Sequence, residues 1–149
     1  MRDDSLKLVI ALARSHNALF TLIEKNIRSF GLTMSEFGVL EALLHKGELP
    51  VQKLCEKILV TSGSMTYIIN KLGEKGYVRR YRCKKDARVW YVRLTEEGQA
   101  FITGIFPAHE RFIQEILSGV EQEDKKNLIR GLFQMKNSLE QQKDAVRDK

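Results

Sequence analysis

The sequence predicts a mainly α-helical fold with a small β-wing, a winged helix-turn-helix. Two short helical runs, 51–58 and 62–72, are separated by a short turn, and the second run carries a small polar face. Two runs rich in β-forming residues, 77–83 and 89–95, follow directly around a basic tip. Longer apolar helical patterns lie on both sides of this unit.

Length and composition favour one packed domain with additional arms. The chain has 149 residues, of which 43% are hydrophobic. No apolar run approaches about 18 residues, and the first residues lack the features of a signal peptide, so we expect no membrane span. Two cysteines make no disulfide framework, which favours a cytoplasmic protein with reduced thiols. We expect a single chain-long fold over 1–149, with a winged helix-turn-helix DNA-binding lobe at 33–95 and dimerisation helices at 5–30 and 96–143.

The first helix is expected at 5–30, because apolar residues recur there at spacings of three and four. A second apolar line makes this helix apolar on more than one side, as expected if it packs on its own lobe and on a partner. A wide core helix in a monomer is the alternative. Gly31 ends it, and Thr33 with Glu36 predicts a capping box for the next helix. Pro50 suits the first turn of the helix after that.

The second helix of the motif has the pattern of a recognition helix. Its apolar stripe would face inward, with Thr61 as the expected N-cap. Small hydroxyl side chains at a helix start let the backbone approach DNA closely, and larger polar side chains further along reach base edges or phosphates. An ordinary solvated face is the alternative. The candidate DNA-binding residues on this helix are Ser62, Ser64, Thr66, Tyr67, Asn70 and Lys71.

Positive charge is concentrated on the wing and on the end of the recognition helix. Residues 71–93 hold nine cations and two anions, a net +7, whereas the whole chain carries +6. A basic unit in a nearly neutral body indicates a polyanionic partner. At the wing tip, Lys84, Lys85 and Arg88 are candidate DNA contacts, since an arginine there can enter the narrow minor groove. Asp86 would hold the Arg88 guanidinium in place, and a plain surface ion pair is the alternative.

Two apolar helices follow the wing. Thr95 should cap the first of them, Pro107 should kink it and Gly119 should end it. The last helix should run from Glu121 to about Lys143. Neither helix carries DNA-facing chemistry, so both would join the first helix in a dimer module. A two-fold dimer would present two recognition helices, about 34 Å apart, to a palindrome.

This arrangement resembles the MarR family of transcriptional regulators over essentially the whole chain. The signature is Asp86-x-Arg88 in the wing, followed by a Leu-Thr-x-x-Gly motif that ends at Gly98. The resemblance implies a homodimeric repressor on double-stranded DNA, whose helix at 62–74 enters the major groove and whose Arg88 enters the minor groove. It also implies release by a small aromatic or phenolic effector, bound where the dimer helices meet the DNA-binding lobe.

Three segments also resemble the hydroquinone- and quinone-responsive branch of that family: 62–67, Cys83 and 105–109. The peroxide-sensing branch keeps its reactive cysteine in the first helix, where this chain has none. Cations around Cys83 favour a thiolate, so an auxiliary redox thiol switch in the wing is a hypothesis, with an inert cysteine as the alternative. The candidate effector pocket comprises His16, Phe20, Phe37, Leu40, Phe106 and His109, most of which would be core residues if no pocket exists.

Other kinds of chemistry find less support. The three histidines lie far apart in no nucleophile or metal motif, and there is no glycine-rich phosphate loop, so we expect neither an enzyme nor a bound cofactor. A zinc-responsive regulator that uses Glu24, His45 and His109 is an alternative with an incomplete ligand set. A winged-helix module that binds protein instead of DNA is another, and the charge on the wing argues against it.

Overall fold

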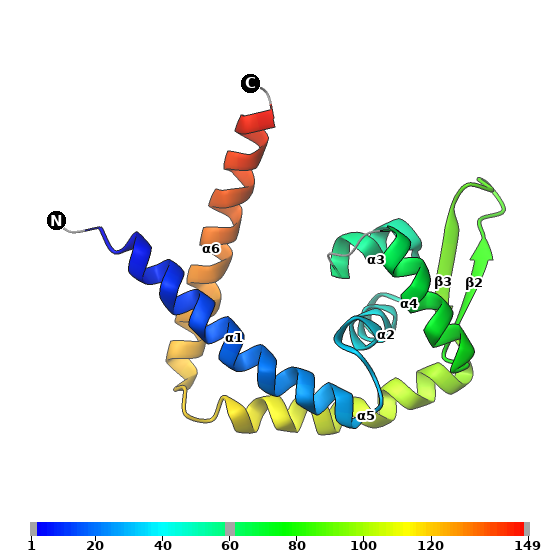
Figure 1. Ribbon diagram of the computed structural model, residues 1–149, viewed down its shortest axis with the longest axis horizontal. Helices are drawn as coiled ribbons and strands as arrows, with labels where there is room; N and C mark the ends of the chain where they lie inside the picture. Colours follow the sequence, from blue (N-terminus) through cyan, green and yellow to red (C-terminus); the bar gives the residue numbers. More distant parts are fainter. Residues whose placement is uncertain (1–2, 59–61, 148–149) are drawn as a thin grey trace. The chain divides into compact units, whose positions relative to one another are not determined.

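The computed structural model describes residues 3–58 and 62–147. The chain divides into two compact units, Met1–Phe112 and Ile113–Lys149, and the boundary falls inside the fifth helix. Figure 1 shows the elements in chain order. They are α1 (Ser5–Ser29), α2 (Met34–Lys46), β1 (Leu49–Pro50), α3 (Val51–Ile58), α4 (Ser62–Glu74), β2 (Val78–Arg82), β3 (Trp90–Leu94), α5 (Glu96–Ile116) and α6 (Gln122–Arg147).

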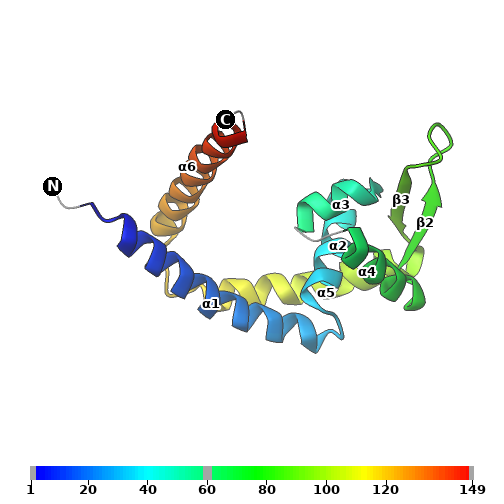
Figure 2. The same cartoon turned by 45° about the horizontal axis from the view of Figure 1, so that its top comes forward.

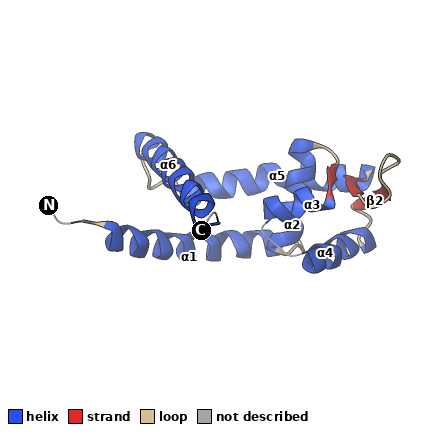
Figure 3. Ribbon diagram, turned by 90° about the horizontal axis from the view of Figure 1, so that it is seen from above, coloured by secondary structure: helices blue, strands red, loops and turns tan. Residues whose placement is uncertain are grey.

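A small antiparallel sheet with strand order β1-β3-β2 is the β structure of the described residues, and all other regular elements are helices (Figure 3). β2 and β3 pair from Val78 opposite Leu94 to Arg82 opposite Trp90. They project as a hairpin beside α4 (Figures 1 and 2). Each strand is one residue shorter at both ends than the sequence suggested. The mainly helical fold with a small β-wing is therefore confirmed.

The third strand, β1, was not expected from the sequence. Leu49 pairs with Val92 and Pro50 pairs with Tyr91, and α3 begins at Val51. Proline suits a short edge strand, because it has no N–H group that would be left unpaired there. The prediction that Pro50 lies in the first turn of the helix is therefore wrong by one residue.

The predicted turn at 59–61, with its N-cap Thr61, lies outside the described residues, and so does the side chain of Ser62. The two helices that flank this turn, α3 and α4, have the bounds expected for a helix-turn-helix.

The core of the first unit lies between the helices of the motif and the base of the sheet. The predicted inward stripe of α4 is buried, with both Ile68 and Ile69 contributing to it. Each fully buried Leu, Ile or Met side chain contributes about 1.5–3 kcal/mol of hydrophobic free energy, so this stripe fixes α4 on the lobe. The core residues are Ile27, Leu32, Phe37, Val39, Leu40, Leu43, Leu54, Met65, Ile68, Ile69, Leu72, Val78, Val92 and Ile102.

Two predicted helix caps are present. Thr33 Oγ1 accepts from the Glu36 N–H at 3.1 Å, and the Glu36 carboxylate accepts from the Thr33 N–H at 3.3 Å, so the capping box is confirmed. Thr95 Oγ1 accepts from the Gly98 N–H at 2.9 Å and caps α5. These short-range signals place the starts of α2 and α5 correctly.

The C-terminal ends of the last two helices differ from the prediction. α5 ends at Ile116 instead of Gly119, and α6 continues past Lys143 to Arg147. Between Glu140 and Arg147 the chain has no glycine or proline and is rich in good helix formers, so nothing in that stretch ends the helix.

Apolar side chains are exposed along α1 in the first unit and along α6 in the second. Leu6 is 79% and Phe133 is 60% exposed. Among the described helices, α1 is also long and apolar enough, by length and composition alone, to cross a membrane, with a mean hydropathy of 1.3. It is not an uninterrupted apolar run, because Arg14 and His16 lie within it. The exposed residues are Leu6, Leu8, Val9, Ile10, Leu12, Phe20 and Leu22 of α1 and Leu128, Ile129, Leu132, Phe133 and Leu139 of α6.

Candidate nucleic-acid interface

α4 presents an exposed polar face next to the hairpin of β2 and β3 (Figure 2). Ser64, Thr66, Tyr67 and Asn70 are exposed on it, and Tyr67 is 64% accessible despite its large ring. The Lys71 ammonium lies 5.6 Å from the centroid of the Tyr67 ring, close enough for a cation–π contact. Five of the six candidate residues on this helix therefore share one accessible surface.

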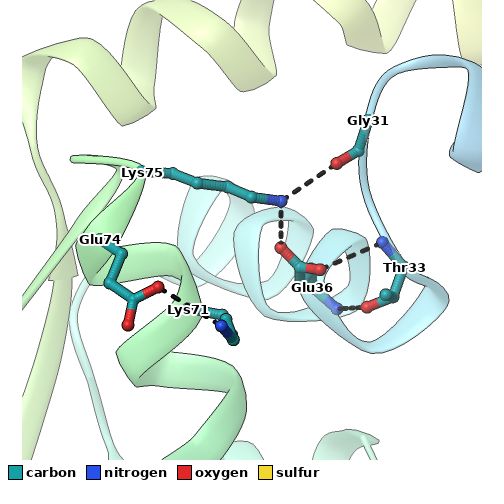
Figure 4. Close-up of polar contacts among 6 residues, drawn as sticks. All are labelled: Gly31, Thr33, Glu36, Lys71, Glu74 and Lys75. Carbon is teal, nitrogen blue, oxygen red and sulfur yellow. Dashed lines mark hydrogen bonds and ion pairs between the residues drawn. The ribbon is translucent and has the colours of Figure 1, made fainter.

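An ion pair ties the C-terminal end of α4 to the junction between α1 and α2 (Figure 4). The Lys75 ammonium donates to Glu36 Oε2 at 2.7 Å and to the Gly31 carbonyl at 3.0 Å. Glu36 is buried, and its other oxygen, Oε1, accepts from the Thr33 N–H. One carboxylate therefore completes the capping box of α2 and also holds the end of the candidate recognition helix.

The base of the wing is closed by contacts between the segment that enters it and the segment that leaves it. The Thr95 N–H donates to the Tyr77 carbonyl at 3.0 Å, and the Thr95 hydroxyl donates to the Gly76 carbonyl at 2.5 Å. A Cβ atom on Gly98 would lie 1.9 Å from the Tyr77 carbonyl oxygen. The Leu-Thr-x-x-Gly motif thus has a physical basis, because its threonine closes the hairpin and caps α5 while its glycine allows the close approach.

One face of the hairpin is braced against the segment between α2 and β1. The Tyr81 hydroxyl donates to the Glu48 carboxylate, and this hydrogen bond, followed by burial, raises the pKa of Tyr81. The Tyr81 ring stacks on Tyr91 with centroids 5.7 Å apart, and the Arg93 guanidinium lies 5.6 Å from the Tyr81 centroid. These contacts join β2 of the wing to the segment between α2 and β1 and to β3.

Asp86 holds Arg88 at the wing tip. The Arg88 N–H and Nε donate to Asp86 Oδ1 at 3.0 and 3.1 Å, and Nη2 donates to Oδ2 at 3.2 Å. These bonds, from the side chain first and then the backbone, lower the pKa of Asp86. The side chain of Arg88 is nevertheless 91% exposed. With Lys84 and Lys85 exposed beside it, the tip presents an exposed cation whose orientation Asp86 restricts.

The two cysteines are free thiols in different settings. Cys83 is half-buried where β2 gives way to the tip loop, and its N–H donates to the Val89 carbonyl at 2.8 Å. Cys55, also half-buried, packs against the core from α3. The thiol hypothesis for Cys83 therefore remains a prediction.

Three of the six candidate effector residues lie together, with two polar neighbours. The rings of Phe37 and His109 are 4.6 Å apart, and those of Phe106 and His45 are 5.4 Å apart. His109 Nδ1 and Asn26 Oδ1 are 2.8 Å apart and join α5 to α1. Burial lowers the pKa of His109, against the opposing effect of the Glu41 carboxylate, so the neutral imidazole is favoured.

The remaining three candidates divide differently. Leu40 is fully buried in the core. His16 and Phe20 stack on each other at 4.4 Å on α1, where Phe20 is partly exposed. Their placement near an effector stays a prediction.

The zinc alternative gains no support from the described residues. No three histidine, cysteine, aspartate or glutamate side chains among residues 3–58 and 62–147 lie close enough to hold a metal ion. Glu24 pairs with Arg28 at 2.8 Å, and His45 Nδ1 contacts the Glu41 carbonyl at 2.9 Å.

Arg80 and Arg82 belong to the nine cations at 71–93 and Trp90 to the β-forming run at 89–95, but none of them is among the candidate residues predicted from the sequence. The structure brings all three to one face of the hairpin. Their spacing was the available signal, because residues i and i+2 of a strand share a face with the residue opposite them.

Comparison with known proteins identifies relatives of this chain. A model of the MarR family matches residues 32–90. The transcriptional regulator MhqR of Bacillus subtilis (strain 168) is 40% identical to this chain over 124 residues, which cover 83% of this chain and 86% of MhqR.

Solved structures share the fold. AbsC, a MarR-family regulator from Streptomyces coelicolor, has a TM-score of 0.83 at 21% identity, covering 94% of this chain and 97% of AbsC. FabT of Streptococcus pneumoniae, solved in complex with DNA, has a TM-score of 0.73 at 23% identity, covering 93% and 99%. NadR, solved with 4-hydroxyphenylacetate, has a TM-score of 0.73 at 21% identity, covering 91% and 96%.

The fold, with a polar helix face and a basic hairpin side by side, defines a winged-helix DNA-binding transcriptional regulator. Relatives of this kind regulate transcription and are not enzymes. This chain belongs to the MarR family.

Proposed function

We propose that this protein is a homodimeric repressor that binds a palindromic operator and leaves it when a small aromatic effector binds. The observation that carries the proposal is the exposed face of α4 beside a tip on which Asp86 holds an exposed Arg88. With α4 in the major groove, Tyr67 and Asn70 would meet base edges, and Arg88 would enter the adjacent minor groove. FabT, which shares this fold, has been solved in complex with DNA, and this supports DNA as the partner. The other candidates, Ser62, Ser64, Thr66, Lys71, Lys84 and Lys85, would contact phosphates and bases.

Exposed apolar surface on α1 and α6 supports dimerisation. Together with Tyr67, these two helices hold the exposed large hydrophobic residues of the described chain. Removing an exposed Leu or Phe side chain from water contributes about 1.5–3 kcal/mol, so we expect a second copy of this chain to pack on these side chains. Sedimentation velocity should give a species of twice the 17.2 kDa chain mass. A monomer at micromolar concentration would contradict the dimer. Because the proposed partner is DNA, the cytoplasm is the expected compartment of this protein.

Operator binding is tested by fluorescence anisotropy on duplexes from the DNA upstream of the protein's own gene, with a scrambled duplex as competitor. Arg88→Ala should weaken binding by about tenfold or more, because a charge-assisted hydrogen bond is worth about 1.5–3 kcal/mol. It should also lower the salt slope by about 0.9. Lys126→Ala, an exposed cation of α6, is the matched control and should leave both values unchanged. An unaltered affinity in Arg88→Ala would remove the wing from the interface.

The cluster of Phe37, Phe106 and His109 is the proposed effector site. Aromatic faces beside the neutral imidazole and the Asn26 amide suit a flat phenolic ring that both stacks and hydrogen-bonds. The structure of NadR with 4-hydroxyphenylacetate supports a phenolic ligand class. The cluster joins α1, α2 and α5, so a ligand there would act on the helices that support α4.

The effector is tested by adding 2-methylhydroquinone to the preformed operator complex. Dissociation is expected, and Phe106→Leu should raise the concentration required without changing operator affinity in the absence of the compound. A complex that ignores the compound would refute the aromatic effector and leave DNA binding intact.

Cys83 carries a second candidate for control, since it lies half-buried next to Lys84 and Lys85 in the tip loop. A quinone could modify this thiol and alter the wing. Unchanged release by quinones in Cys83→Ser would eliminate the thiol switch.

A further inference from the structure

Two arginines of β2 stack against one tryptophan of β3. The Arg80 and Arg82 guanidinium carbons lie 4.8 Å and 4.9 Å from the centroid of the Trp90 ring. Arg82 pairs directly with Trp90 across the strands, and Arg80 is two residues along on the same face. Both arginines are exposed, whereas Trp90 is half-buried. The indole thus restricts the orientations of two otherwise flexible cations.

This stack continues the core face of the sheet. Val78 shares its face with Arg80, and Val92, opposite Arg80, shares that face from β3. Both valines are buried in the core at the base of the hairpin. Arg79 and Arg93 lie on the other face, with Tyr81. One face of the sheet therefore packs on the helices at the base of the hairpin, and nearer the tip the same face carries Arg80 and Arg82 stacked on Trp90.

Arg80 lies between α4 and the wing tip. A hollow of about 380 Å³ is lined by Thr66 and Ile69 of α4 and by Arg80, Arg88 and Trp90 of the hairpin, and also by residues of β1 and α3. A second hollow, of about 460 Å³, is lined by Asn70 and Glu74 of α4 and again by Arg80, and Glu74 pairs with Lys71. Arg80 is thus common to both hollows between the two elements proposed to enter the grooves of DNA.

The cations in this place differ in whether a carboxylate of the protein pairs with them. Arg88 has Asp86, and Lys71 has Glu74 at 3.5 Å. Within the described part of the chain, no carboxylate forms an ion pair with Arg80 or its neighbour on the indole. An oriented guanidinium without a carboxylate partner is suited to an anionic ligand.

We infer that Arg80, positioned by Trp90, binds the sugar–phosphate backbone that separates the major groove read by α4 from the minor groove reached by Arg88. The inference rests on the proposed function, and it adds a contact at a defined place on the operator. One strand of backbone must pass between two elements that occupy adjacent grooves, and the hollows lined by Arg80 lie between those elements. Arg82 is the second cation for the same backbone, nearer the tip.

The first test is the salt dependence of DNA binding in single variants. One phosphate contact contributes a slope of about 0.9, so Arg80→Ala should lose that slope and about eightfold in affinity at 0.1 M salt. The loss should be equal on operator and scrambled duplexes, because a phosphate contact carries no sequence information. Arg79→Ala removes the same charge from the opposite face and is the matched control. If both variants had the same effect, the inference would be overturned, because the overall electrostatic attraction of the basic hairpin to DNA would explain the loss.

The positioning role is tested at Trp90 itself. Trp90→Leu should reproduce most of the Arg80→Ala effect, and Trp90→Phe, which keeps an aromatic face, should restore most of the slope. Circular dichroism checks that Trp90→Leu is folded. If it is not, the comparison of the two single variants Trp90→Phe and Arg80→Ala tests the positioning role instead. A wild-type slope in folded Trp90→Leu would remove the positioning role.

Trp90 also provides a direct readout, because it is the only tryptophan in the chain. Backbone bound at Arg80 should shield the indole, so saturating operator should reduce acrylamide quenching of its emission at least about twofold in wild type and much less in Arg80→Ala. If the wild-type complex forms normally but the quenching is unchanged, the inference about Arg80 would be overturned and the proposed function would stand. Absence of any specific complex would overturn the proposed function together with it.

Discussion

Replacing Lys75 with methionine should destabilise the protein by about 2 kcal/mol, far more than an ordinary surface substitution. The ammonium makes one charged hydrogen bond to buried Glu36 and one to the Gly31 carbonyl (Figure 4). Both bonds have a charged donor, and a hydrogen bond that involves a charged group contributes about 1.5–3 kcal/mol. The Lys75 side chain is 36% exposed, so solvent weakens both hydrogen bonds, and a loss of about 2 kcal/mol, below their combined contribution, is expected.

The measurement is urea and thermal unfolding followed by circular dichroism at a fixed protein concentration, because a dimer's stability depends on it. A loss of 2 kcal/mol corresponds to a decrease in Tm of about 7 °C for a chain of this size. Lys71→Met is the matched control, since Lys71 pairs with Glu74 at 3.5 Å on an exposed part of α4, close to Lys75 in sequence. It should change stability by less than about 0.5 kcal/mol.

The double variant Glu36→Gln with Lys75→Met separates the ion pair from other effects. Methionine alone leaves a buried carboxylate without its cation, and glutamine removes that charge. The double variant should therefore be less destabilised than the sum of the single variants, with a coupling of about 1–2 kcal/mol. Additive effects, or a Lys75→Met cost below about 0.5 kcal/mol, would refute the assignment of this pair as a support for α4.

Three further outcomes are expected. Gly98→Ala should cost about 3 kcal/mol or more in urea unfolding, because its Cβ would overlap a backbone oxygen, whereas Gly104→Ala, with nothing within 4 Å, should be neutral or stabilising. The free energy of unfolding should fall as the pH decreases from about 7 to 5.5. Burial lowers the pKa of His109 below its unfolded value of about 6.5, so the unfolded chain binds more protons than the folded chain in this range. A His109→Gln variant with the same steep fall would contradict this. Tyr81→Phe loses the hydrogen bond to Glu48 and should lower stability by about 0.5–1 kcal/mol in thermal unfolding, and a higher Tm would show that the bond is not favourable.

The helices and the wing could be predicted because their signals are local. The spacing of apolar residues in α4 and the pairing of Thr33 with Glu36 act over three or four residues, and both are present in the structure. Strand β1 could not be predicted in the same way. Two residues carry no periodicity, and Pro50 pairs with Tyr91, which lies far along the chain.

Some contacts of the candidate interface could likewise be predicted from the sequence, and others could not. The Asp86–Arg88 pair was predictable, since the two residues are separated by a single position at a turn. The stacking of Arg80 on Trp90 depends on the register of two strands, which only the folded hairpin specifies. The same is true of the effector candidates, of which Phe37 and His109 come together from different helices.

The sequence by itself determined the kind of protein: the order of helices, the winged helix-turn-helix, the location of the positive charge and the family. Those properties depend on periodicity, capping and composition, which act between near neighbours or sum over the chain. Only the tertiary structure decided which side chains support the interface. Glu36 and Lys75 are 39 residues apart, and Asn26 and His109 are 83 apart. Such pairs form only when the burial of several helix faces brings distant segments together, so no local pattern specifies them.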